Sequence, residues 1–87
     1  MAIRGTRVIS CNHGDSYENI DQWVEVHGHC GTNEKSIISG TLTLNEGGTS
    51  VTAVIVWEDE AAKAAWKAGL TPFTRSYDIV SKIDEIV

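Results

Sequence analysis

The sequence predicts a single α+β domain in which a four-stranded antiparallel sheet has helices on one face. Three observations lead to this prediction. A β-branched run over residues 49–57 leads directly into a helical pattern that ends at Gly69. A segment of alternating polarity precedes this run, and a glycine-containing loop separates the two. A second helical pattern lies nearer the N-terminus, and the length of 87 residues is that of one domain.

The first predicted strand covers residues 2–11. Arg4, Thr6 and Ser10 alternate there with a second set, which consists of Ile3, Gly5, Arg7 and Ile9. Val8 and Ile9 are β-branched. The sequence Asn-His-Gly-Asp at 12–15 is a turn cluster, which ends the strand.

The first predicted helix starts at Asp15 or Ser16, because Glu18 stands three residues after Asp15 in the spacing of a capping box. Its apolar face has the i, i+3, i+4, i+7 spacing and consists of Ile20, Trp23, Val24 and His27. Gly28 is a typical C-terminal stop, and residues 29–35 are predicted to form a loop.

The second and third strands are predicted over residues 36–44 and 49–57, as an antiparallel hairpin. From position 39 onward, hydroxylated residues alternate with apolar or small ones in the second strand. The connecting loop contains Gly47 and Gly48, which tolerate positive φ. The third strand is apolar along nearly its whole length, which is typical of a central strand that is covered on both faces.

The second helix is predicted over residues 60–68, with Asp59 as its N-cap. Acidic residues stand at its start, and Lys63 and Lys67 lie further on, as the helix dipole prefers. Its narrow apolar face consists of Ala62, Ala65, Trp66 and Gly69.

The C-terminal segment is predicted to form a short helix and then a strand. Pro72 suits the first position of a helix, and apolar residues at helical spacing continue to about Ser81. The last residues, 82–87, are predicted to close the sheet. The order is then β-α-β-β-α-β with a short extra helix, which is the ferredoxin-like pattern. One apolar face of the sheet stays bare in this arrangement, and we expect a second copy to cover it in a homodimer.

Composition excludes several classes of partner. The net charge is −5 with Lys and Arg scattered along the chain, which argues against nucleic acid and against anionic membranes. No apolar run has the length of a signal peptide or of a membrane span, so we expect a cytoplasmic protein. We therefore expect Cys11 and Cys30 to be reduced.

The segment around the second helix resembles a known family. A strand that ends in Trp57, the acidic run 58–60 and an aromatic residue at Trp66 are similar to the dimeric α+β barrel superfamily, in particular to small antibiotic-biosynthesis-monooxygenase-like domains. The resemblance implies a barrel formed by two copies. It also implies an activity such as cofactor-independent oxygenation of an apolar or aromatic small molecule, with no cofactor. Relatives that degrade haem use a His after the second helix, and residues 69–77 contain none.

An aromatic pocket between helices and sheet is the predicted site. The predicted ligand-binding side chains are Trp23, Trp57, Trp66 and Tyr77. The predicted catalytic groups are His27, Asn12 and Arg7. In an oxygenase they accept a phenol proton and stabilise the resulting anion, and His27 has a suitable pKa for the base. The alternative is that these residues are core, in a non-catalytic binding or assembly module.

A metal site is a third hypothesis. It would use the two cysteines together with His13, His27 and His29, all of them ligand types for Zn, Cu or Fe. The first helix is expected to run back toward the start of the first strand, which separates the two ligand groups by about 15–20 Å. On this ground we expect no metal. The acidic run 58–60 is explained by helix capping.

Overall fold

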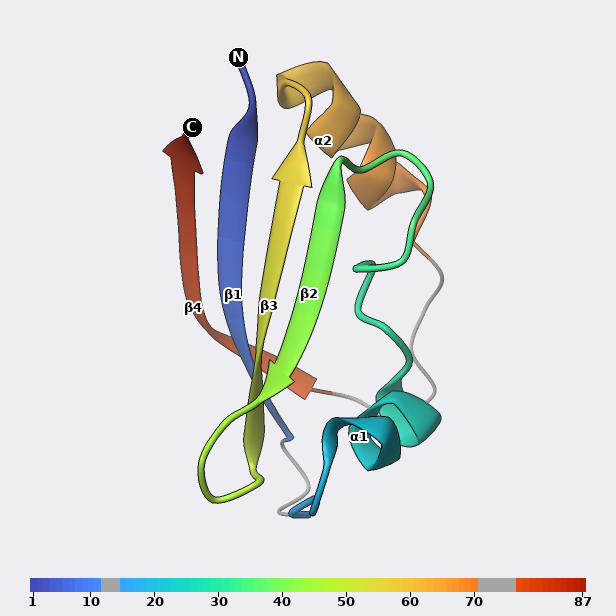
Figure 1. The fold of residues 1–87 in the computed structure, drawn as a ribbon, viewed down its shortest axis with the longest axis vertical. Coiled ribbons are helices and arrows are strands. Elements are labelled where there is room, and N and C mark those ends of the chain that lie inside the picture. Colours follow the sequence, from blue (N-terminus) through green and yellow to red (C-terminus); the bar gives the residue numbers. More distant parts are fainter. Residues whose placement is uncertain (12–14, 71–76) are drawn as a thin grey trace.

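A computed structural model of the chain describes residues 1–11, 15–70 and 77–87. Within them it has four strands and two helices, shown in Figure 1. In chain order these are β1 (Ile3–Cys11), α1 (Ile20–His27), β2 (Ser39–Leu44), β3 (Ser50–Trp57), α2 (Glu60–Ala68) and β4 (Tyr77–Ile86). The predicted order β-α-β-β-α-β and the α+β class are therefore confirmed.

The four strands form one antiparallel sheet in the order β2-β3-β1-β4. The central strands pair from Ile3 opposite Trp57 to Ser10 opposite Ser50. Both helices lie on the same face of the sheet, with α2 near one end of the strands and α1 near the other (Figure 1). This arrangement is compatible with a ferredoxin-like fold.

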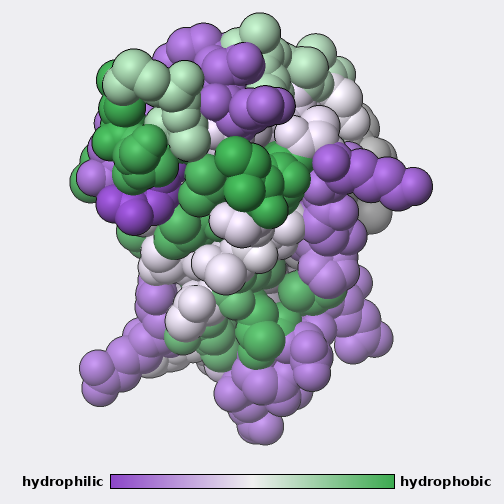
Figure 2. All heavy atoms as spheres, turned by 45° about the horizontal axis from the view of Figure 1, so that its top comes forward, coloured by the Kyte–Doolittle hydropathy of each residue, from purple (hydrophilic) through white to green (hydrophobic). Residues whose placement is uncertain are grey.

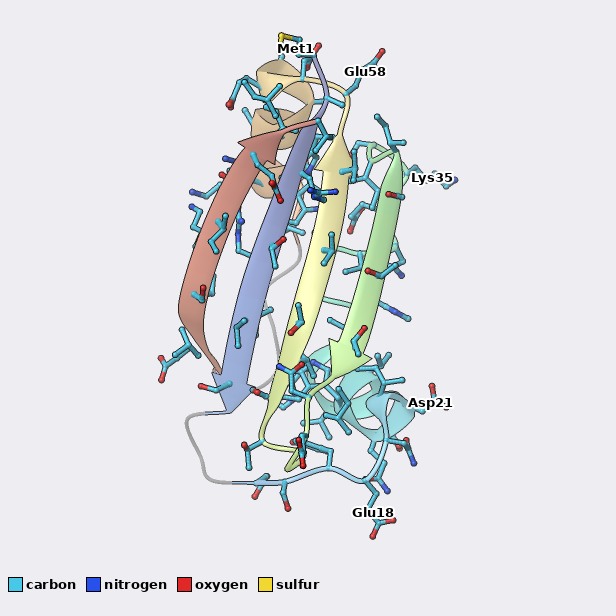
Figure 3. All side chains as sticks on the ribbon, turned by 60° about the vertical axis from the view of Figure 1, so that its left-hand side comes forward. Met1, Glu18, Asp21, Lys35 and Glu58 are labelled. Carbon is cyan, nitrogen blue, oxygen red and sulfur yellow. The ribbon has the colours of Figure 1, made fainter. Side chains whose placement is uncertain are left out.

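Side chains of β1 and β3 alternate strictly between the two faces. In β3 the odd-numbered residues face the helices and are buried, whereas the even-numbered ones are half-buried. β3 lies between β1 and β2, so the prediction of a central strand is confirmed. Figure 3 is turned toward the opposite face, and within the described residues no helix covers it.

Each helix is held to the sheet by one tryptophan. Trp23 of α1 is fully buried in a cluster with Ile9 and Val51, near the hairpin. Trp66 of α2 packs against a second cluster that contains Trp57, with 5.0 Å between the ring centroids. The core is thus divided into two parts, one under each helix. Seen from the α2 end, hydrophobic surface is bordered by hydrophilic side chains (Figure 2).

The predicted start of the first helix is wrong. Asn19 is the N-cap of α1, and its side-chain oxygen accepts a hydrogen bond from the Gln22 backbone at 3.0 Å. The earlier residues cannot join the helix, because the backbone N–H of Tyr17 donates to Gly48 in the hairpin loop at 2.8 Å. The predicted stop is confirmed, since Gly28 follows the last residue with φ of 79°.

The prediction for the C-terminal segment is partly wrong. The predicted helix over 72–81 lies outside the described residues up to 76, and from Tyr77 onward the chain is strand instead. The cause is pairing with β1, which β4 follows over nearly its whole length with one irregularity between Val8 and Ile9. The apolar spacing in this segment reflects the two faces of an irregular edge strand.

The hairpin and the second helix agree with the predictions. Gly47 and Gly48 both have positive φ in the loop between β2 and β3. The side chain of Asp59 caps α2 by accepting a hydrogen bond from the Ala62 backbone at 2.8 Å. The second strand is shorter than predicted, because it begins at Ser39 and not at residue 36. Within the described residues, no helix is long and apolar enough to cross a membrane.

Candidate functional site

A pocket of about 460 Å³ lies between α2 and the helix-facing side of the sheet. We call it the α2 pocket. Its floor is formed by side chains of the three neighbouring strands β1, β3 and β4: Arg7, Ile9, Ala53, Ile55, Ile79 and Lys82. The positions on β1 and β3 face the helices because side chains alternate across the sheet. On β4, Ile79 and Lys82 are three residues apart and reach the same face through the register irregularity opposite Val8 and Ile9. A concave apolar surface with a few polar groups is typical of small-molecule sites.

One stripe of α2 forms the wall of the α2 pocket. Its residues are Glu60, Lys63, Ala64 and Lys67. Their i, i+3, i+4, i+7 spacing places them on one side of the helix. Trp66, Leu70 and Cys30 complete the lining. Every residue of α2 keeps some solvent exposure, so this helix covers the sheet only loosely.

Arg7 is the most buried charge in the α2 pocket, with only 7% of its surface exposed. Its Nη1 donates to the Asp84 carboxylate at 2.6 Å and, at longer distances, to the carbonyl oxygens of Thr6 and Ile83. Lys63 Nζ donates to the other oxygen of the same carboxylate. Burial acts to raise the pKa of Asp84, but hydrogen bonds and charge from the two cations outweigh it and hold that pKa below its usual value.

The ring of Trp57 lies close to both of these cations. The Arg7 guanidinium carbon lies 5.9 Å from the Trp57 ring centroid, and Lys63 Nζ lies 5.7 Å from it. Such distances allow cation–π attraction. The ring itself lies over Gly5, where an added Cβ would come within 2.6 Å of two ring carbons. Glycine at this position therefore allows the indole to lie directly on β1.

Trp66 fixes α2 at the pocket. Its indole N–H donates to the Gly31 carbonyl at 2.9 Å. Gly31 has φ of 80°, and a Cβ there would meet the Trp66 ring at 2.6 Å. The loop after α1 and the helix α2 are joined by this contact, although they are far apart in sequence.

A second aromatic cluster lies on α1, apart from the α2 pocket. Trp23 and His27 stack with ring centroids 4.1 Å apart and an interplanar angle of 19°. Both are almost completely buried, and Tyr17 meets each ring edge-on. Cys30 packs in the same part of the core, where burial raises the pKa of its thiol and the Trp23 indole offsets only part of that effect. A thiol kept protonated in this way is a poor nucleophile.

The structure does not bring the predicted site residues together in one place. Arg7 and Trp66 line the α2 pocket, and Trp57 lies against them. Trp23 and His27 form the separate cluster on α1, and neither lines the pocket. Two predicted residues lie beyond what can be placed: Asn12 is outside the described residues, and of Tyr77 only the backbone, at the start of β4, is described.

Sequence reasoning missed the lysines of the pocket. The spacing of Lys63 and Lys67 was a usable signal, but it was fully explained by the helix dipole. Lys82 gave no local signal, because its place opposite Arg7 depends on the register between β1 and β4.

The expected geometry of the metal hypothesis is wrong. α1 has only eight residues and ends near the end of β1, so Cys30 packs against Ile9 rather than near the start of that strand. Among the described residues, no group of three or more His, Cys, Asp or Glu side chains is placed to hold a metal ion.

Comparison with known proteins gives no match to a family model, to a curated protein or to a solved structure. The resemblance to the dimeric α+β barrel superfamily therefore stays a prediction.

Proposed function

We propose that this protein binds an apolar or aromatic small molecule in the α2 pocket. The main support is the pocket itself, which has a volume of about 460 Å³ beneath a helix without a fully buried residue. Ligand pockets commonly have volumes of about 300–1,000 Å³. The apolar floor around Ile9, Ala53 and Ile55 gives such a molecule a surface against which it can exclude water.

The geometry favours a protein that binds the small molecule without catalysing a reaction. The predicted base, His27, is 2% exposed and stacked on Trp23, so it has no path to a molecule in the α2 pocket. A general base must lie within hydrogen-bond reach of the proton it removes. The function that we infer is therefore that of a non-catalytic binding module.

Cofactor-independent oxygenation is the second candidate, and the position of Arg7 favours it. A buried guanidinium in the pocket can stabilise an aromatic oxyanion, which is one of the roles expected of this residue. Oxygen consumption with polyphenolic aromatics tests this candidate. We expect a rate that Arg7→Met abolishes while the thermal midpoint stays high enough for the variant to remain folded. If no bound aromatic compound leads to oxygen uptake, cofactor-independent oxygenation is ruled out.

We also propose that two copies pack through the uncovered sheet face to form a dimeric α+β barrel. Apolar side chains of this face include Val8, Val54 and Val56, which are half-buried, and Ile83, which is 58% exposed. In a second copy the same side chains would meet by two-fold symmetry.

Light scattering tests the dimer. We expect twice the chain mass of 9.5 kDa for the wild type and the chain mass for Val54→Lys. Thr49→Lys, at an exposed position in the hairpin before β3, serves as the control and should stay dimeric. A wild-type mass of a single chain would contradict the proposal.

Binding is tested with N-phenyl-1-naphthylamine, a neutral aromatic probe whose fluorescence rises in apolar surroundings. We expect saturable fluorescence with the wild type and loss of it in Ala64→Phe, because the new ring fills the α2 pocket. Ala61→Phe adds the same ring to an exposed α2 position outside the pocket lining and should bind as the wild type does. Equal binding by both variants would show that the probe lies elsewhere.

A further inference from the structure

We propose that the α2 pocket selects an anionic ligand, an apolar organic acid whose acid group lies against Arg7, Lys63 and Lys82. This inference rests on the proposed function and deepens it, because it names the class of small molecule. It assigns the apolar body of the ligand to the end of the pocket near Ile9 and Ile79.

The charge of the pocket is opposite to that of the chain. The protein has a net charge of −5 and seven Lys and Arg residues in all. Four of these seven line the α2 pocket: Arg7, Lys63, Lys67 and Lys82. Against them stand two carboxylates, Glu60 in the lining and Asp84 bonded to Arg7 and Lys63. A positive pocket in a negative protein attracts an anion and repels a cation.

The α2 pocket has a charged end and an apolar end. Along its floor, Arg7 of β1 stands opposite Lys82 of β4, and two residues further Ile9 stands opposite Ile79. These pairs are neighbours on the helix-facing side of the sheet, and all four side chains line the pocket. A molecule with an acid group on an apolar body matches this division, whereas a wholly apolar or a wholly polar molecule matches only one end.

Several cationic donors in the pocket remain available to a ligand. All hydrogen bonds of Arg7 to described residues leave from Nη1, so Nε and Nη2 have no partner in the described part of the chain. Lys67 and Lys82 likewise have no ion pair with any described residue. Guanidinium groups bind carboxylates through two parallel N–H donors, and Arg7 retains enough donors to bind one.

Burial makes the contact with Arg7 effective. The side chain of this residue is only 9% exposed, and the Trp57 ring lies beside it. Charges interact more strongly where water is excluded, so an acid group at Arg7 gains more than it would at an exposed lysine. Asp84 uses one side of the guanidinium and holds it in place.

A matched pair of probes tests the inference. N-phenyl-1-naphthylamine is neutral, and 1-anilinonaphthalene-8-sulfonate has the same aromatic framework with an acid group. We expect the wild type to bind the sulfonate about tenfold more tightly than the neutral probe at low ionic strength. In 0.5 M salt the Debye length is only about a few ångströms, so charges are screened and this preference should shrink. Binding of the neutral probe should change little with salt.

Two variants locate the effect. Lys82→Met should weaken binding of the sulfonate about fivefold relative to binding of the neutral probe. Lys35→Met removes the same charge from an exposed residue that extends away from the sheet in Figure 3, and it should change neither affinity. Both positions are exposed, so we expect both variants to fold as the wild type does.

The possible outcomes separate the two proposals. Equal binding of the two probes would overturn the anionic preference and leave the proposed function intact. A preference for the sulfonate that stays near tenfold in Lys82→Met, or that Lys35→Met reduces as much as Lys82→Met does, would also overturn the inference, because the cations of the pocket would then not be its cause. If neither probe binds, the pocket is not a site for such molecules, and both proposals fall.

Discussion

Arg7, Asp84 and Lys63 form the most consequential group of residues in this protein. The carboxylate of Asp84 accepts hydrogen bonds from both cations, and one of them, Arg7, is buried. A buried charge without a partner is costly, so Asp84 determines how easily Arg7 is kept at the floor of the α2 pocket. Because the hydrogen bond to Asp84 uses only Nη1 of Arg7, the other donors of this guanidinium stay available to a ligand.

Replacement of Asp84 by Asn should destabilise the fold by about 2 kcal/mol at neutral pH, because two charge-assisted hydrogen bonds lose their ionised acceptor. The folded-state pKa of Asp84 lies below its ordinary value of 3.8. Its contribution to stability is therefore complete above that pH and is lost as the pH falls through the folded-state pKa. Urea denaturation at pH 7 and at pH 3 measures this, and the difference between wild type and variant should shrink at the lower pH.

Glu85→Gln is the matched control for this prediction. Glu85 pairs with Arg4, but both side chains are more than 40% exposed. Exposed ion pairs contribute little, so this variant should differ from the wild type by less than about 0.5 kcal/mol. A loss as large as that of Asp84→Asn would show that the position of the pair in the pocket has no special role.

At the scale of elements, α2 is the part of the fold that depends most on a single side chain. The helix forms locally, with the Asp59 cap at its start. Its attachment is tertiary, and Trp66 supplies it through the ring of Trp57 and the carbonyl of Gly31. A helix held at one side in this way leaves the α2 pocket between itself and the strands β3, β1 and β4.

Trp66→Phe and Trp66→Ala should separate the two parts of this attachment. Phe keeps an aromatic ring against Trp57 but loses the hydrogen bond to Gly31, which costs about 1 kcal/mol. Ala removes both and should cost about 3 kcal/mol. Urea denaturation gives the free energies, and amide hydrogen exchange should show faster exchange in α2 than in β3. Equal losses for the two variants would mean that ring packing does not hold the helix.

The sequence alone predicts some elements better than others. Elements that depend on neighbouring residues are predicted well, whereas elements that depend on contacts with distant segments are not. α2 was predicted with its exact cap, because Asp59 and the helix pattern are adjacent in the chain. β4 was predicted as helix up to Ser81, since Tyr77 and Val80 have helical spacing and the strand that pairs with them is β1, at the other end of the chain. α1 begins late because Tyr17 bonds to the hairpin loop, a contact that no local pattern reveals.

At the scale of the whole molecule, the same distinction explains the candidate site. Arg7 and Trp66 were predicted as site residues and do line the α2 pocket. Lys82 reaches it only through the β1–β4 register, which includes an irregularity between Val8 and Ile9. His27 has helical spacing that places it on the apolar face of α1, but the two helices lie at opposite ends of the sheet and form separate core clusters (Figure 1).

The claim that small molecules bind in the α2 pocket is tested most directly by nuclear magnetic resonance of the nitrogen-labelled protein, titrated with N-phenyl-1-naphthylamine. The three tryptophan indole N–H signals report on different places: Trp66 lines the pocket, Trp57 supports its cations, and Trp23 lies in the α1 cluster. We predict large, saturable shifts for the Trp66 indole and the backbone of Ala53 and Ile55, with little change at Trp23. Shifts centred on Trp23, or none at all, would contradict the account.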